Sequence, residues 1–548
     1  MSSPLEHTQH LNLLPRGATP APMEPLAKYR VGPVERRRPL SKSLVWSLER
    51  RFYEEQGKDA WIKGGIPHYV TSNPIIGGAY AKVVFGFLRD CHSLGKGPLR
   101  IVELGAGHGR FAHCFLTRFI KLHERSALAR IPFRYIMTDL AERNIDHWRS
   151  HPKLRRFIDD GILDFARFDV GTDREIRLRC SGEVIMVDDP CANLAVIANY
   201  VFDSVPQDAF HVKDGRLYET LITLTLSDAH PNLDSPGALA GAAASYDHGP
   251  ARDDYYEDAD WNGILASYRD RLADCSFQFP TAALTCIKDL RRLTTGGFLL
   301  LSGDKGYSDE RALLAGSGAP SFAPHHAGCF SVMVNYHAIG EYFAKHGGRV
   351  LHPGHGFESV TISAFAASDP PTPFVETTQA YAESVDELGP DDLFNLMMAL
   401  EEQYVCLPLP QILSWIRMTG HDSRVFLRCA PGLEHQCAQA SEQQRRDLAA
   451  MLDEVWEASF PLVEDFDLAL QIGALFYAMQ LFTRAITYFQ WSIDDARATP
   501  GALHNIGLCH YHLNQIEAAL GSFLGALEID PDYEPARRMR IIAEASIG

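Results

Sequence analysis

Hydrophobic and polar positions follow two different patterns along this chain. From Leu99 onward, short apolar runs alternate with longer amphipathic stretches, and most runs end in polar or glycine residues. Such alternation indicates strands joined by helices and therefore a parallel sheet. The runs interpreted as strands are 99–104, 133–138, 163–170, 194–199, 298–303, 349–352 and 359–365, and 184–187 is interpreted as a hairpin piece. We predict an α/β fold with a seven-stranded sheet across 98–368.

Two long polar stretches, near 226–262 and 305–330, interrupt this alternation. Loops of this length inside a domain are usually lids or disordered insertions. Residues 41–97 precede the sheet and have a helical pattern, with Ser72 or Asn73 as an N-cap. Residues 1–40 are Pro-rich and polar, which predicts a flexible N-terminal segment.

The C-terminal region, 390–548, has a helical pattern throughout and follows a predicted linker over 369–389 that opens in a Pro-rich run. It contains an internal repeat with a period of 34 residues. The pairs at this spacing are Ile472 and Ile506, Gly473 and Gly507, Ala485 and Ala519, and Phe489 and Phe523. The pattern is similar to tetratricopeptide repeats, placed near 466–499 and 500–533. Two repeats cannot bury a full core, so the helices of 390–460 are expected to stack on them.

Composition disfavours several classes of function. The chain has 548 residues and a net charge of −17, which disfavours general nucleic-acid binding. No apolar run reaches the roughly 18 residues of a membrane span, and no secretory signal is seen. The eleven cysteines are scattered without zinc spacing. These features predict a cytoplasmic protein with no metal site.

The segment from Leu99 to Phe115 carries the strongest chemical signal. A predicted strand ends in Glu103-Leu104, the glycine turn Gly105-Ala106-Gly107-His108-Gly109 follows, and a helix begins at Arg110. Glycine lets a ligand approach the backbone, and a helix N-terminus offers free N–H groups. In a dinucleotide fingerprint the third glycine stands one place later, where this chain has Arg110. Asp139 ends the next strand, 34 residues after Gly105.

This spacing resembles motif I of class I methyltransferases, which bind S-adenosylmethionine (SAM) on a Rossmann-like sheet. The resemblance implies that the turn packs against the methionine part of the cofactor. It also implies that Asp139 accepts hydrogen bonds from both ribose hydroxyls and that Asp169 meets the adenine amino group. The predicted cofactor-binding residues are Glu103, Gly105, Ala106, Gly107, Gly109, Asp139, Leu140, Asp169 and Asn199. NAD or FAD is the alternative ligand.

The segment after the fourth strand, Asn199 to Phe210, resembles the NE-x-x-DALPV-x-x-F segment of the MidA-type family. That family consists of SAM-dependent enzymes linked to respiratory complex I assembly, and its mitochondrial member is a protein-arginine methyltransferase. The resemblance covers roughly residues 65–370. This chain departs from the pattern at Tyr200, where the family has Glu, and at Asn73, near the family's Pro-Glu.

Methyl transfer to nitrogen or oxygen is an in-line displacement that depends on positioning. Strong anions at the sulfur would favour the ground state, because the positive charge of the cofactor is lost in the reaction. The amide of Asn199 suits this position. Asp203, one turn further on, can orient the nucleophile or accept its proton. Asn199 and Asp203 are therefore the predicted catalytic residues.

We therefore predict a SAM-dependent methyltransferase. The first hypothesis is N-methylation of a protein or peptide, with arginine as one acceptor, recruited by the helical repeats. The second is a small-molecule N- or O-methyltransferase of a biosynthetic pathway. The third is a non-catalytic scaffold or assembly factor that retains a SAM pocket. A homodimer is compatible with the sequence.

Overall fold

The computed structural model describes residues 32–63, 66, 68–95, 97–226, 233, 238–315, 329–354, 359–401, 403–437, 439–462, 466–495 and 499–546. The chain divides into two compact units after Asp392. Each unit is described by itself below.

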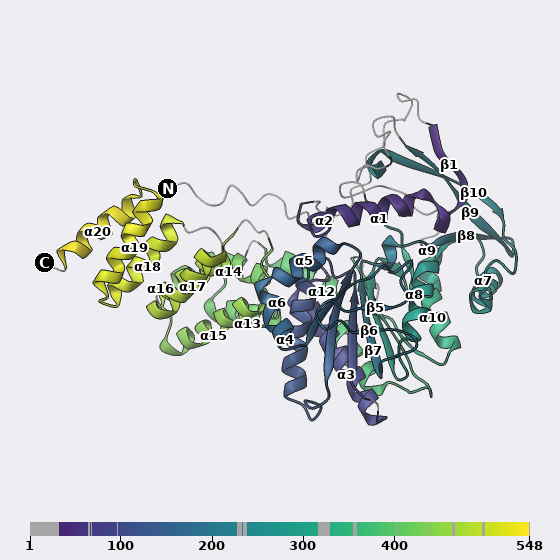
Figure 1. The fold of residues 1–548 in the computed structure, drawn as a ribbon, viewed down its shortest axis with the longest axis horizontal. Helices are drawn as coiled ribbons and strands as arrows, with labels where there is room; N and C mark the ends of the chain where they lie inside the picture. The colour runs from purple at the N-terminus through teal and green to yellow at the C-terminus, as the bar shows by residue number, and fades with distance from the viewer. Residues whose placement is uncertain are drawn as a thin grey trace. The chain divides into compact units, whose positions relative to one another are not determined.

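A seven-stranded sheet forms the centre of the first unit (Figure 1). Its order is β15-β16-β12-β7-β2-β3-β4, and the five strands from β12 to β4 are parallel. The outer strands β16 and β15 run antiparallel to their neighbours. The bounds are β2 Leu99–Leu104, β3 Phe133–Asp139, β4 Leu163–Arg167, β7 Asn193–Asn199, β12 Phe298–Asp304, β15 Arg349–Leu351 and β16 Thr361–Ala367.

Helices cover both faces of this sheet (Figure 1). Helices α3 and α4 pack together on one face, and α8 and α10 lie on the other. Cover on both faces explains why the strands are almost continuously apolar, since neither face meets water. The helices of this unit are α1 Leu44–Gln56, α2 Asp59–Ile62, α3 Pro74–Ser93, α4 Arg110–Glu124, α5 Glu142–Ser150, α6 Pro152–Asp159, α7 Ala259–Arg271, α8 Thr281–Arg291, α9 Glu310–Ala315, α10 Tyr336–Lys345 and α11 Val375–Tyr381.

The start of α3 shows how local sequence fixes an element. The side chain of Asn73 accepts hydrogen bonds from the backbone N–H groups of Ile75 and Ile76, each at 3.0 Å. Pro74 occupies the first helical position, where the missing N–H costs nothing. One of the two predicted N-cap candidates, Asn73, is thus confirmed as the cap.

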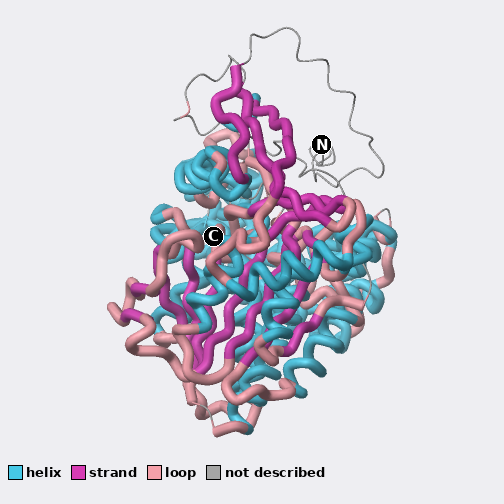
Figure 2. Tube along the Cα trace, turned by 90° about the vertical axis from the view of Figure 1, so that its right-hand side faces the viewer, coloured by secondary structure: helices cyan, strands magenta, loops and turns pink. Residues whose placement is uncertain are grey.

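A second sheet extends beyond one end of the central sheet (Figure 2). Its order is β1-β9-β8-β11, and β10 pairs antiparallel with β9 off this path, along residues Tyr218–Leu226. A separate core that includes Leu40, Trp46, Ile222 and Leu224 stabilises it. The bounds are β1 Gly32–Pro39, β8 Asp208–Lys213, β9 Arg216–Leu226, β10 Ala242–Pro250 and β11 Cys275–Phe279. Two small ladders pair β5 Ile176–Arg177 with β6 Val184–Ile185, and β13 Gly306–Tyr307 with β14 Val334–Asn335.

The second unit is helical, as predicted. Within it, α16 packs on α17 and α18 packs on α19. The same contact occurs in both pairs: Gly473 lies against the ring of Phe489, and Gly507 lies against the ring of Phe523. The structure therefore repeats this contact at the 34-residue spacing of the sequence. The helices are α12 Pro390–Ala399, which spans the boundary, α13 Leu409–Met418, α14 Ser423–Cys437, α15 Glu442–Ala458, α16 Leu468–Ala478, α17 Phe482–Asp495, α18 Pro500–His512, α19 Ile516–Ile529 and α20 Glu534–Ala545.

Three segments differ from their predictions. The segment predicted as flexible over 1–40 contains β1, which pairs with β9. The predicted linker, 369–389, contains α11, which packs on α3 because Gly86 leaves room for the backbone of Glu376. The predicted insertion near 226–262 contributes β10, a regular strand. Within the insertion near 305–330, residues 316–328 lie outside the described residues. No helix among the described residues has the length and apolar character needed to cross a membrane.

We expect the repeated glycine contact to be tested by Gly507→Ala. A Cβ there would lie 2.5 Å from the Phe523 ring, so the substitution should destabilise this helix pair by about 1–3 kcal/mol. Gly521→Ala, also in this pair, is the matched control, because open space surrounds Gly521 and alanine favours helix by about 0.5–1 kcal/mol. Hydrogen exchange of the α18 and α19 amides measures both. Equal protection in the two variants would contradict the assignment.

Candidate active site

The glycine turn joins β2 to α4 at the carboxyl edge of the parallel strands. Gly105, Gly107 and Gly109 have φ angles of +62°, +54° and +87°, a region that side chains with a Cβ rarely adopt. Ala106 donates its N–H to the carbonyl oxygen of Thr138 at 2.9 Å, which ties the turn to β3. The turn therefore presents backbone, rather than side chains, along much of its length.

Asp139 fixes this turn from the end of β3. One carboxylate oxygen accepts the N–H of Gly107 at 3.0 Å, and the other accepts the N–H of Ala141 at 2.9 Å. Burial raises the pKa of Asp139, and these backbone hydrogen bonds oppose the shift. A carboxylate has about four acceptor positions, so both oxygens can still accept hydroxyl groups. Leu140, the next residue, is partly exposed.

Two acids predicted to meet the cofactor have other partners in this structure. The carboxylate of Glu103 accepts a hydrogen bond from the Tyr135 hydroxyl at 2.9 Å, and burial raises the pKa of Glu103 to about 8. Glu103 is therefore largely neutral near pH 7. Asp169 accepts the N–H of Gly171 at 2.8 Å and forms an ion pair at 2.8 Å with Arg50 of α1. An adenine amino group at Asp169 would have to share or displace Arg50.

Asn199 ends β7, which pairs with β2 so that Ala198 lies opposite Leu104 at the start of the glycine turn. The loop after Asn199 also contacts the turn, since a Cβ on Gly105 would meet Val201 at 2.9 Å. The Oδ1 of Asn199 accepts the hydroxyl of Tyr80 at 2.8 Å. Gly303 of β12 leaves room for this bond, because a Cβ there would lie 2.8 Å from both atoms. The Nδ2 of Asn199 is buried and has no hydrogen-bond partner among the described residues. A buried hydrogen-bond donor without a partner lowers stability by about 1–3 kcal/mol. It therefore indicates that a ligand supplies a hydrogen-bond acceptor at this point.

The chain turns sharply after Asn199. Tyr200 has a φ of +53°, and the short helix Phe202–Ser204 (η3) follows. For a bulky residue this backbone conformation is strained, and such strain concentrates at functional sites. Asp203 lies in η3 and accepts the Ser204 hydroxyl at 2.9 Å. Burial raises the pKa of Asp203 to about 6.

Two further acids, which sequence reasoning did not single out for this role, interact with Asp203. Burial and the Asp203 charge raise the pKa of Asp304 well above its usual value. Burial likewise raises the pKa of Glu49 on α1, and Asp203 adds to that shift. One oxygen of each, Glu49 Oε1 and Asp304 Oδ1, has no hydrogen-bond partner in the described part of the chain. A bound cation would favour the ionised form of all three groups.

Helices α1 and α2 cover this edge of the sheet (Figure 1). Trp61 lies over the turn, since a Cβ on Gly107 would be 3.2 Å from its ring, and it stacks on Tyr53. Sequence reasoning missed this cover. The only signal was an aromatic residue in the polar stretch 57–65, which has no amphipathic period.

Comparison with known proteins supports the cofactor prediction. Residues 86–318 match the model of a family described as "Putative S-adenosyl-L-methionine-dependent methyltransferase". No curated protein matches the chain. SAM is the cofactor of the matched family, which agrees with the sequence prediction and supports a SAM-dependent methyltransferase.

Solved structures show weaker likeness. One is a Burkholderia thailandensis protein bound to S-adenosyl-homocysteine, with 14% identity over 64% of this chain and 91% of that chain and a TM-score of 0.41. Another is the magnesium protoporphyrin IX methyltransferase of Synechocystis PCC 6803, with 11% identity over 59% of this chain and 99% of that chain and a TM-score of 0.26.

The residues present suit this cofactor. The glycine turn offers exposed backbone, Asp139 has acceptor capacity left for a sugar, and Asn199 holds an unpaired buried donor. Among the described residues, no group of three or more His, Cys, Asp or Glu is arranged to hold a metal ion.

Gly107→Arg tests the role of the turn. The side chain would enter space between the turn and Trp61 at a backbone conformation that arginine rarely adopts. Calorimetric titration with S-adenosylhomocysteine should show binding by the wild type and a loss of at least about tenfold in affinity, or about 1.4 kcal/mol, in the variant. Gly161→Arg is the control for a positive-φ glycine, because open space surrounds Gly161. Equal binding by wild type and Gly107→Arg would exclude the turn as the binding site.

Proposed function

We propose that this chain transfers a methyl group from SAM to a nitrogen atom of a protein or peptide. Bound SAM supplies the electrophilic methyl group at the carboxyl edge of the sheet. The Asn199 Nδ2, which is buried and unpaired beside the glycine turn, is the observation on which the proposal depends. The resemblance of Asn199–Phe210 to the MidA-type segment supports it further.

Cofactor placement follows from the turn. The backbone of Gly105–Gly109 would hold the methionine part, and the Asp139 carboxylate would accept the ribose hydroxyls. Leu140 would pack beside the nucleoside. Asp169 would meet adenine in competition with Arg50, and Glu103 would support the strand end through Tyr135.

Asn199 and Asp203 carry out the chemistry in this proposal. The Asn199 amide donates a hydrogen bond without adding a negative charge near the sulfonium. An acceptor that arrives as a cation has no lone pair available for attack, so Asp203 would first accept a proton from its nitrogen. The freed lone pair would then form the new N–C bond as the S–C bond breaks and S-adenosylhomocysteine leaves. The acids Glu49, Asp203 and Asp304 favour a cationic group, which supports an amine or guanidine acceptor rather than a neutral hydroxyl.

The C-terminal helices support a protein or peptide as the methyl acceptor. Their repeated Gly–Phe contacts resemble those of tetratricopeptide repeats, which commonly present a groove to a peptide. We propose that this unit recruits the substrate protein.

Incubation of the full chain with radiolabelled SAM and cell lysate tests the acceptor class. The proposal predicts label in the macromolecular fraction with wild type and none with Gly107→Arg. Label confined to small metabolites would instead identify a biosynthetic methyltransferase. Label in neither fraction, with S-adenosylhomocysteine still bound, would indicate a scaffold.

The pKa of Asp203 predicts a pH dependence. Its ionised form is needed to accept the proton, so kcat/KM should fall as pH decreases through about 6. Asp203→Asn should lower kcat by about 10²–10⁴-fold and remove this acidic limb. Initial rates with the labelled protein fraction between pH 5 and 8, a range that spans the Asp203 pKa, measure both effects. An unchanged acidic limb in the variant would exclude Asp203 as the base.

A further inference from the structure

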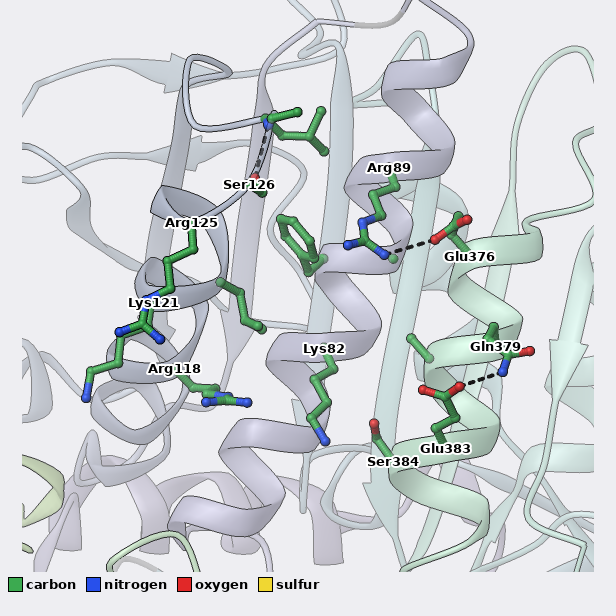
Figure 3. Close-up of a pocket in the computed structure, with 16 residues that line it drawn as sticks. Lys82, Arg89, Arg118, Lys121, Arg125, Ser126, Glu376, Gln379, Glu383 and Ser384 are labelled. Carbon is green, nitrogen blue, oxygen red and sulfur yellow. Dashed lines mark hydrogen bonds and ion pairs between the residues drawn. The ribbon is translucent and has the colours of Figure 1, made fainter. Parts of the chain in front are cut away.

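A basic groove lies in the first unit between α3, α4 and α11 (Figure 3). Its volume is about 660 Å³, within the range of functional binding sites. Its floor is partly apolar and includes Phe85, Leu122 and Leu128. Its charged lining consists of Lys82, Arg89, Arg118, Lys121, Arg125, Glu376 and Glu383.

The acidic side chains of this groove already have partners, whereas several cations do not. Glu376 pairs with Arg89 at 3.1 Å, and Glu383 accepts a hydrogen bond from Gln379. In the part of the chain that the structure describes, Lys82, Arg118 and Arg125 form neither an ion pair nor a side-chain hydrogen bond. With five cations and two acids in its lining, the groove is a locally positive region on a chain whose net charge is −17.

The groove lies along α3 and α4, which also frame the active site. Helix α4 begins at the glycine turn, and Arg118 lies about 12 Å further along its axis. A ligand in the groove therefore leaves the turn accessible. This separation suits a docking surface that holds a partner while the active site remains free.

We propose that this groove binds an extended acidic segment of a partner protein. Arg118 and Lys121 of α4 and Arg125, its C-cap, form a row of about 10 Å, and Lys82 and Arg89 form a row of similar length along α3. Alternate residues of an extended peptide lie about 7 Å apart. Their carboxylates can therefore meet successive cations of a row, while small apolar side chains reach the floor.

The same geometry disfavours other anions. A single phosphate is held by cations that converge on one point, whereas these side chains are spread along two helices. A nucleic acid would bring a continuous polyanion to an acidic protein, and no aromatic side chain other than Phe85 lines the groove to stack a base.

Fluorescence anisotropy with the full chain tests this inference. The probe is a fluorescein-labelled peptide of alternating glutamate and alanine, titrated at low salt. Wild type should bind it, and binding should weaken as salt increases. Arg118→Glu and Lys82→Glu should each reduce affinity by about tenfold. Arg155→Glu, an exposed charge reversal on α6, should change affinity by less than about twofold.

Four outcomes would overturn the inference. One is no binding by wild type, and another is equal weakening by Arg155→Glu. The third is tighter binding of pyrophosphate or single-stranded RNA than of the peptide in competition. Thermal unfolding followed by circular dichroism shows whether each variant is folded, and sedimentation shows whether a second copy of the chain is the occupant. The fourth outcome is self-association that Arg118→Glu abolishes, because the occupant of the groove would then be a second copy of this chain.

Discussion

The hydrogen bonds from Gly107 and Ala141 to Asp139 are the constraint on which the site depends. They hold the glycine turn against the end of β3, so that α4 begins at a fixed place on the carboxyl edge. The contact of Gly105 with Val201 then sets the loop after β7 beside the turn. A buried carboxylate that lost these donors would be left partly unpaired, at a cost of about 1–3 kcal/mol or more.

Unsatisfied groups gather on the other side of the same edge. Asn199 Nδ2, Glu49 Oε1 and Asp304 Oδ1 are buried without a partner among the described residues, and Tyr200 has a strained backbone. Each of these features lowers stability, and none improves packing. A ligand that accepts from the amide and carries positive charge toward the acids would relieve them together. The proposed chemistry therefore explains features that the fold alone does not.

The sequence was informative where local pattern decides structure. The apolar runs that form strands, the glycine turn, the Asn73 cap and the 34-residue spacing are local or periodic signals, and the structure contains each. Contacts between segments far apart in the chain could not be predicted from the sequence. β1 gains its stability from β9, almost two hundred residues away, and α11 docks on α3 through the gap at Gly86. For the same reason the pairing of Asp169 with Arg50 and the cover by Trp61 could not be predicted.

A crystal structure of the full chain with S-adenosylhomocysteine tests the central claim most directly. We expect the ribose hydroxyls within hydrogen-bond distance of both Asp139 oxygens and the methionine part along Gly105–Gly109. We also expect an atom that accepts a hydrogen bond opposite Asn199 Nδ2. A ligand bound elsewhere, or a nicotinamide dinucleotide held in the same turn with higher affinity, would contradict the assignment.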